Sequence, residues 1–178
     1  AASATVASGA AAAHAKPRTE RAGPFAPGEV LGFDVSWSTY LTAGTLTVAV
    51  NEKRPSFGSV AYYITAEGRP TPLLSKLYSL YYKADTLIDV FTLLPQRGST
   101  YSEESGRRRM KITRFNQAAR TAQFEMQTAT VFKKDLAVPP YSQDILSALL
   151  VMRALPLKAG ARITMPVSDS GEIYRVSI

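Results

Sequence analysis

Short segments in which apolar and polar residues alternate with a period of two constrain the fold of this chain more than any other feature. In the clearest, Leu31, Phe33, Val35 and Trp37 alternate with small or polar residues. Such alternation is typical of a β-strand with one buried face. Roughly eight segments have strand character, and they cover 31–37, 45–50, 60–66, 85–91, 106–115, 121–132, 162–167 and 172–178.

Turn signals separate these segments. The short spacing of the first two favours a hairpin with its turn at 42–44, and residues 116–120 can connect a second hairpin. Residues 51–58 are predicted to be a loop, because they contain Lys53, Arg54, Pro55, Ser56 and Gly58. Residues 73–80 fit either a short helix or the beginning of a strand.

One segment, 142–153, has the pattern of an amphipathic helix. Ser142 can cap its first turn, and Asp144 complements the helix dipole. Its expected apolar face consists of Ile145, Leu146, Leu149 and Met152. A single helix among strands usually covers one side of a sheet. We therefore predict a mainly β protein: an antiparallel curved sheet or partly open barrel with one amphipathic helix packed on it.

The chain divides into two expected parts. Residues 1–24 begin with a small, nearly uncharged, Ala-rich stretch, which we expect to be a disordered tail left by a signal peptide or serving as a linker. Residues 25–178 are expected to form one β-rich domain. Because the strand-like pattern runs to the last residue, we expect this domain to have further C-terminal strands that the chain lacks.

The charge balance is basic, with 21 Lys and Arg against 14 Asp and Glu and a net charge of +7. Basic proteins attract phosphates, but here the excess is spread along the chain and a short basic run is a weak motif, so nucleic-acid binding is not expected. An anionic lipid surface attracts the same charge. The candidate contacts with such a surface are Arg107, Arg108, Arg109 and Lys111, although these residues could equally line a solvated sheet face.

The residues needed for several kinds of catalysis are missing. The chain has no cysteine, and its single histidine, His14, lies in the Ala-rich stretch. Thiolate chemistry and zinc sites are therefore not expected, and a Ser-His-Asp triad lacks its imidazole. No metal or cofactor is predicted. The carboxylates are scattered, and no spacing favours one pair, so we expect no enzyme, with a carboxylate-dependent cell-wall hydrolase as the less favoured alternative.

Aromatic residues gather in the predicted β region and leave two interpretations open. They could form a packed core whose tyrosine hydroxyls reach the rim. Alternatively, they could line an apolar cavity inside a curved sheet, where a lipid-like ligand can bind. The candidate ligand-binding residues of this second interpretation are Phe33, Trp37, Tyr62, Tyr78, Tyr82 and Leu149.

Several stretches together resemble one family of exported bacterial proteins, known as domain of unknown function 3108. They occur in the right order from residue 25 to the end of the chain, at 25–37 with 43–44, 74–78 with 87–89, and 141–149 with 153–157 and Gly160. The resemblance implies export to the periplasm or outer envelope and a β-dominated, barrel-like fold. More loosely, that architecture is similar to periplasmic lipoprotein carriers, whose curved sheets hold acyl chains. It supplies no catalytic residues.

Two functional hypotheses follow. The first is a non-catalytic periplasmic or envelope module that binds a lipid-like or lipoprotein ligand in an apolar groove, with peripheral contact to a membrane. The second is an envelope assembly or scaffold factor that binds another envelope protein through a sheet edge, since unpaired edges recruit strands.

Overall fold

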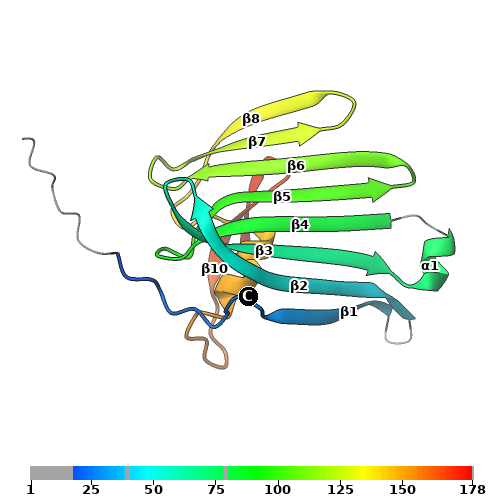
Figure 1. The fold of residues 1–178 in the computed structure, drawn as a ribbon, viewed down its shortest axis with the longest axis horizontal. Coiled ribbons are helices and arrows are strands. Elements are labelled where there is room, and N and C mark those ends of the chain that lie inside the picture. The colour runs from blue at the N-terminus through cyan, green and yellow to red at the C-terminus, as the bar shows by residue number, and fades with distance from the viewer. Residues whose placement is uncertain (1–17, 39–40, 78–79, 178) are drawn as a thin grey trace, which may run out of the picture.

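The computed structural model describes residues 18–38, 41–77 and 80–177, and eight strands form its large sheet. The sheet is antiparallel, and each strand is hydrogen-bonded to the next strand in the sequence (Figure 1). Within the described residues no pairing joins β1 to β8, so the sheet is open. The strands are β1 (Val30–Ser38), β2 (Leu41–Ser56), β3 (Ser59–Pro70), β4 (Leu80–Asp89), β5 (Pro95–Glu104), β6 (Arg107–Asn116), β7 (Thr121–Gln127) and β8 (Val131–Ala137).

A smaller sheet and a helix cover part of one face of the large sheet. Strands β9 (Gln143–Asp144), β10 (Thr164–Asp169) and β11 (Glu172–Ser177) form the smaller sheet, in the order β11-β10-β9. Helix α2 (Ile145–Met152) follows β9 directly and contacts both β4 and β10. Figure 1 shows α2 and β10 behind the large sheet. We call the covered face, which carries Ile64, Ala84 and Thr86, the inner face.

The main core lies between the inner face and α2. Ile64 of β3, Ile88 of β4 and Leu150 of α2 are all fully buried in it. Side chains on a strand alternate between its two faces, so the period-two pattern of the sequence delivers apolar residues to this side. Burial of each such side chain contributes roughly 1.5–3 kcal/mol. The prediction of a mainly β protein with an antiparallel sheet and one helix packed on it is confirmed, and the eight described strands of the large sheet do not close into a barrel.

The predicted limits and cap of the helix are wrong. The helix begins at Ile145 and ends at Met152, and its N-cap is Asp144. The Asp144 side chain accepts a hydrogen bond from the Ser147 amide, and the Ser147 hydroxyl accepts one from the Asp144 amide, which makes a reciprocal capping box. Ser142 instead donates its hydroxyl hydrogen to the Pro139 carbonyl.

The predicted apolar face of the helix is wrong in part. Ile145 is 53% exposed, whereas Leu146 and Leu150 are buried against the large sheet. Consecutive residues of an α-helix lie about 100° apart around its axis, so Ile145 lies to one side of Leu146 and Leu150, which face the sheet.

The loop predicted at 51–58 is wrong, because β2 continues to Ser56 and its turn is Phe57-Gly58. Both turn residues have positive φ, 46° and 72°, as tight turns between antiparallel strands require. The charged residues that suggested a loop lie on the aromatic side chains of β3. The guanidinium of Arg54 lies 3.8 Å from the ring centroid of Tyr63. The turn predicted at 42–44 is also wrong, since these residues lie within β2.

Other elements follow the sequence less directly. For residues 73–80 the sequence allowed a short helix or the beginning of a strand, and the structure has both: α1 covers Pro72–Leu77, and β4 begins at Leu80. The predicted strand 121–132 is two strands, β7 and β8, joined by the turn at 128–130. Strand β5 was not predicted, and its composition explains why. Its inner positions are the small residues Gly98 and Thr100, so the apolar alternation is missing.

The segment before β1 reaches the core through a few contacts. Residues 1–17 of the predicted tail lie outside the described residues. Further along, the Arg21 amide donates to the Val90 carbonyl at 2.9 Å. Phe25 is buried and packs edge-on against Tyr62, with the ring centroids 5.2 Å apart. Phe25, the first residue of the predicted domain, is thus part of the core.

Candidate ligand-binding cavity

An apolar cavity of about 380 Å³ lies between the inner face of the large sheet, helix α2 and the β10–β11 hairpin. Strands β2 to β7 contribute one side of it, and α2, β10 and β11 contribute the other. Most of the lining side chains are aliphatic or aromatic, and they include Leu46, Val48, Ala66, Tyr82, Ala84, Phe124, Leu146, Ala148, Leu149, Met152, Val167 and Val176.

The cavity exists because the middle of the sheet carries small side chains on its inner face. Ala66 of β3 pairs with Ala84 of β4, and Ala84 pairs with Thr100 of β5. Next to this row, Gly98 pairs with Thr86. Alanine extends little above a sheet, so space remains between Ala66, Ala84 and α2, whereas the Asp144 side chain occupies the space above Gly98. Larger side chains at these positions would close the cavity.

Asp144 is a buried carboxyl group at one end of the cavity. One of its oxygens accepts a hydrogen bond from the Thr86 hydroxyl at 2.6 Å, and the other accepts from the Ser147 amide at 2.9 Å. Gly98 permits this arrangement, because a Cβ atom there would lie 3.0 Å from the Asp144 side chain. Burial raises the pKa of Asp144, and these hydrogen bonds offset part of the effect. Its role as the N-cap of α2 explains why a carboxyl group is buried at this position.

A second group of polar residues lies where the β10–β11 hairpin meets β6. The Lys111 ammonium donates to the Ser170 hydroxyl at 2.7 Å, and the Ser170 hydroxyl donates to the Asp169 carboxylate at 3.1 Å. Burial raises the pKa of Tyr82, and the charges of Asp169 and Asp144 raise it further. All of these residues line the cavity. The cavity is therefore apolar for most of its surface and polar at this hairpin.

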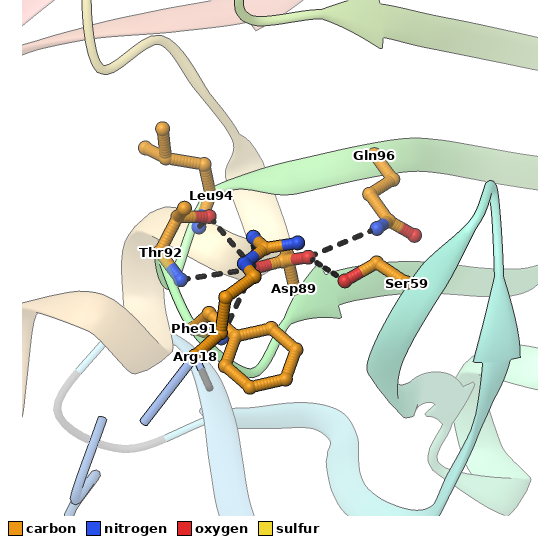
Figure 2. Close-up of polar contacts among 7 residues, drawn as sticks. All are labelled: Arg18, Ser59, Asp89, Phe91, Thr92, Leu94 and Gln96. Atoms are coloured by element: carbon orange, nitrogen blue, oxygen red, sulfur yellow. Dashed lines mark hydrogen bonds and ion pairs between the residues drawn. The ribbon is translucent and has the colours of Figure 1, made fainter. Parts of the chain in front are cut away.

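A second hollow, of about 620 Å³, lies at the turn after β4 and contains the polar cluster around Asp89. Figure 2 shows the Asp89 carboxylate surrounded by hydrogen-bond donors. The Ser59 hydroxyl donates at 2.5 Å, the Thr92 and Phe91 amides at 2.9 and 3.0 Å, and the Gln96 amide nitrogen at 3.3 Å.

These contacts give Asp89 a structural role. Burial favours the neutral form, but the hydrogen bonds from Ser59, Thr92 and Phe91 outweigh burial and lower the pKa of Asp89. Arg18 adds an ion pair at 3.8 Å and lies over the Phe91 ring. The carboxylate thus holds the β4–β5 turn and the segment before β1 together.

Comparison with known proteins gives one match. A family model described as "Protein of unknown function (DUF3108)" matches residues 32–178. The chain belongs to the DUF3108 family. No curated protein and no solved structure matches it. Among the described residues, no helix is long and apolar enough to cross a membrane, and no group of three or more His, Cys, Asp or Glu side chains could hold a metal ion.

The stretches that resemble DUF3108 contain residues with clear structural roles in this fold. Stretch 141–149 includes the Asp144–Ser147 capping box, which fixes the start of α2 over the cavity. Stretch 43–44 includes Gly44, where a Cβ atom would lie 2.4 Å from the Arg69 carbonyl oxygen of the neighbouring strand. Stretch 141–149 thus coincides with the start of the helix that covers the cavity, and Gly44 allows β2 and β3 to approach closely.

The structure brings together two of the six ligand-binding candidates. Tyr82 and Leu149 both line the cavity. Phe33 lies on the inner face beside Leu46, a lining residue, but is 41% exposed and outside the lining. Tyr62 is in the core against Phe25.

The other two candidates have no described side chain. Tyr78 lies outside the described residues, and for Trp37 the description covers the backbone but not the side chain.

The basic run divides between the two faces of the sheet. Lys111 lines the cavity, and strand alternation places Arg109 and Arg107 on the same face as Lys111. Arg108 lies on the opposite face, where it forms an ion pair with Glu103 at 3.3 Å.

Sequence reasoning missed the small inner residues Ala66, Ala84 and Gly98 and the polar residues of the hairpin. The small residues carried a signal, since alanine at alternate positions of two paired strands leaves space above a sheet. No local pattern could have placed Ser170 against Lys111 of β6, because that contact joins segments about sixty residues apart.

Proposed function

We propose that this protein binds a lipid-like apolar ligand in the cavity between the large sheet and α2, without converting it chemically. The observation that carries the proposal is the cavity itself, which has about 380 Å³ of space and a mainly apolar lining. Well-packed interiors leave few voids larger than a water molecule. A cavity of this size and lining is typical of a ligand site, since such sites have about 300–1,000 Å³.

The size of the cavity favours one alkyl chain over several. Its volume lies at the low end of the range for ligand sites. The alkyl chain would lie between the row of small residues, Ala66 and Ala84, and the aliphatic residues of α2. Each methylene group moved from water into such a cavity contributes about 0.8 kcal/mol of binding free energy.

We place this function in the bacterial envelope, in the periplasm or at the outer membrane. The support is the resemblance to DUF3108, which implies export. A lipoprotein acyl chain, or a lipid taken up by peripheral contact with a membrane, would be available there. Fractionation of the source cells, with detection of the untagged protein, tests this location, and recovery in the cytosol alone would contradict it.

The binding proposal is tested by native mass spectrometry of protein purified from its own cells without delipidation. The expected result is a bound mass that organic solvent extracts as a single-chain lipid or acylated molecule. Ala84→Phe, which extends a ring into the cavity, should lower the occupancy and shift the bound mass toward shorter chains. Ala137→Phe, at an exposed position of β8, is the matched control and should retain it. Absence of any bound mass from the wild-type protein would count against the proposal.

A second candidate function has one specific observation behind it. Strand β11 is at the edge of the smaller sheet, and its Tyr174 and Val176 are 51% and 39% exposed. Exposed edges with apolar side chains can add a strand from a protein partner. If this strand recruits an envelope protein, Tyr174→Lys should abolish cross-linking to that partner while ligand binding in the cavity persists.

A further inference from the structure

We infer that the ligand is an amphiphile with one alkyl chain and an anionic head group, a carboxylate or a phosphate, which Lys111 and Arg109 bind at the hairpin end of the cavity. This inference rests on the proposed function, because it assigns the chemistry of the ligand for the same cavity.

The first support is the position of the positive charges. Lys111 lines the cavity and is partly exposed, so its ammonium group can contact both a bound molecule and solvent. Arg109 follows on the same face of β6 and is exposed. Among the described residues, Lys111 forms no ion pair, and its one side-chain hydrogen bond is to Ser170. An anion could replace or join that contact without the loss of a salt bridge.

The second support is that two of the three carboxylates at the cavity are engaged by donors of the protein. Asp85 binds the side chains of Arg97 and Ser99, and alternation along β4 directs it to the outer face. Both Asp144 oxygens accept hydrogen bonds, from Thr86 and Ser147. Asp169 accepts one hydrogen bond, from Ser170. The Lys111 ammonium is therefore the charged donor of the lining that an anionic head group can contact.

The third support is a polar atom that has no partner in the protein. Ser168 lines the cavity, is 4% exposed, and its hydroxyl has no hydrogen-bond partner among the described residues. A buried hydroxyl without a partner is costly, so such groups often mark where a ligand or water binds.

The test compares three molecules by isothermal titration calorimetry at low salt: 1-lauroylglycerol, its 3-phosphate, and glycerol 3-phosphate. The wild-type protein should bind the acylated phosphate about tenfold more tightly than the neutral lipid, since a charge-assisted hydrogen bond contributes more than a neutral one. It should bind the chainless phosphate more weakly than either. Lys111→Met, which removes the charge and keeps the chain, should reduce the preference to about twofold or less, and Lys111→Arg should retain it.

Two further variants separate charge from packing. Arg109→Gln should also weaken the preference for the acylated phosphate over the neutral lipid. Because Arg109 is exposed, this variant tests the charge without a change in the cavity, which Lys111→Met could alter. Lys83→Met removes an exposed charge from the outer face of β4 and should change nothing. Equal affinity of the wild-type protein for both acylated molecules would overturn this inference and leave the proposed function standing. Binding of neither would overturn both, and equal binding of glycerol 3-phosphate would show an anion site that needs no chain.

Discussion

Substitution of Asp144 by alanine tests how the helix is held over the cavity. The variant removes the N-cap side chain of α2, a loss that costs about 1 kcal/mol, within a range of about 0.5–2. It also removes the partner of the fully buried Thr86 hydroxyl. An unsatisfied buried hydroxyl costs about 1–3 kcal/mol, and the low end applies because Thr86 keeps a longer bond to the Arg97 carbonyl at 3.3 Å.

Below the unfolded pKa of Asp144, where the buried carboxyl group is neutral, the two effects together predict a loss of about 2 kcal/mol in the free energy of unfolding. Urea unfolding followed by circular dichroism measures this loss, with the midpoint shifted and the slope unchanged. Asp144→Asn keeps an oxygen for the Ser147 amide and should lose about 1 kcal/mol or less at low pH. A loss below about 0.5 kcal/mol for Asp144→Ala would refute the assignment of this residue as both cap and partner of Thr86.

The pH dependence of stability, compared between the wild type and Asp144→Asn, tests independently whether the pKa of Asp144 is raised. Burial raises the pKa of Asp144 in the folded state, so the ionised form is less favourable there than in the unfolded chain. Wild-type stability relative to Asp144→Asn should therefore fall as the pH rises from the unfolded pKa, about 3.9, through the folded value. A relative gain in wild-type stability over that range would contradict the raised pKa.

Three more predictions concern stability, and urea unfolding measures each. The lowered pKa of Asp89 stabilises the fold above the unfolded pKa, so acid should remove this contribution from the wild type but not from Asp89→Asn; identical acid profiles would contradict it. Gly44→Ala should destabilise strongly, because its Cβ would lie 2.4 Å from the carbonyl oxygen of Arg69, while Gly32→Ala, with open space around it, should change stability little. Leu150→Ala should cost about 2–5 kcal/mol, and a cost below that range would mean that α2 is not anchored by this residue.

Period-two alternation predicted the large sheet well where strands bury one face. The segment around Leu31 and the hairpin of β6 and β7 carry clear alternation, and both are strands. Their faces differ from the prediction, because Phe33 and Val35 of β1 are 41% and 46% exposed, and Lys111 of β6 lies on the inner face opposite Met126. Alternation failed at β5 because its inner residues face the cavity, where small side chains replace apolar ones. It failed at the end of β2 because cross-strand contacts with Tyr62 and Tyr63 hold charged residues in a strand.

The candidate site was harder to predict than the fold. Tyr82 and Leu149 could be chosen from aromatic and helical patterns, and both line the cavity. Tyr62 has the same local pattern as Tyr82, but it is closed off by Phe25, a contact between distant segments that periodicity does not report. Lys111 was predicted as a surface contact, and its place beside Ser170 depends on how the last hairpin folds back over β6.

The dependence of affinity on chain length tests the central claim most directly. Calorimetry with 1-monoacylglycerols that differ by one methylene should show about fourfold tighter binding for each added group, equivalent to about 0.8 kcal/mol, until the cavity is full. In Ala84→Phe, which has less space, this increase should stop at a shorter chain. An affinity that does not depend on chain length, or that changes equally in the wild type and in Ala84→Phe, would contradict binding of an alkyl chain in this cavity.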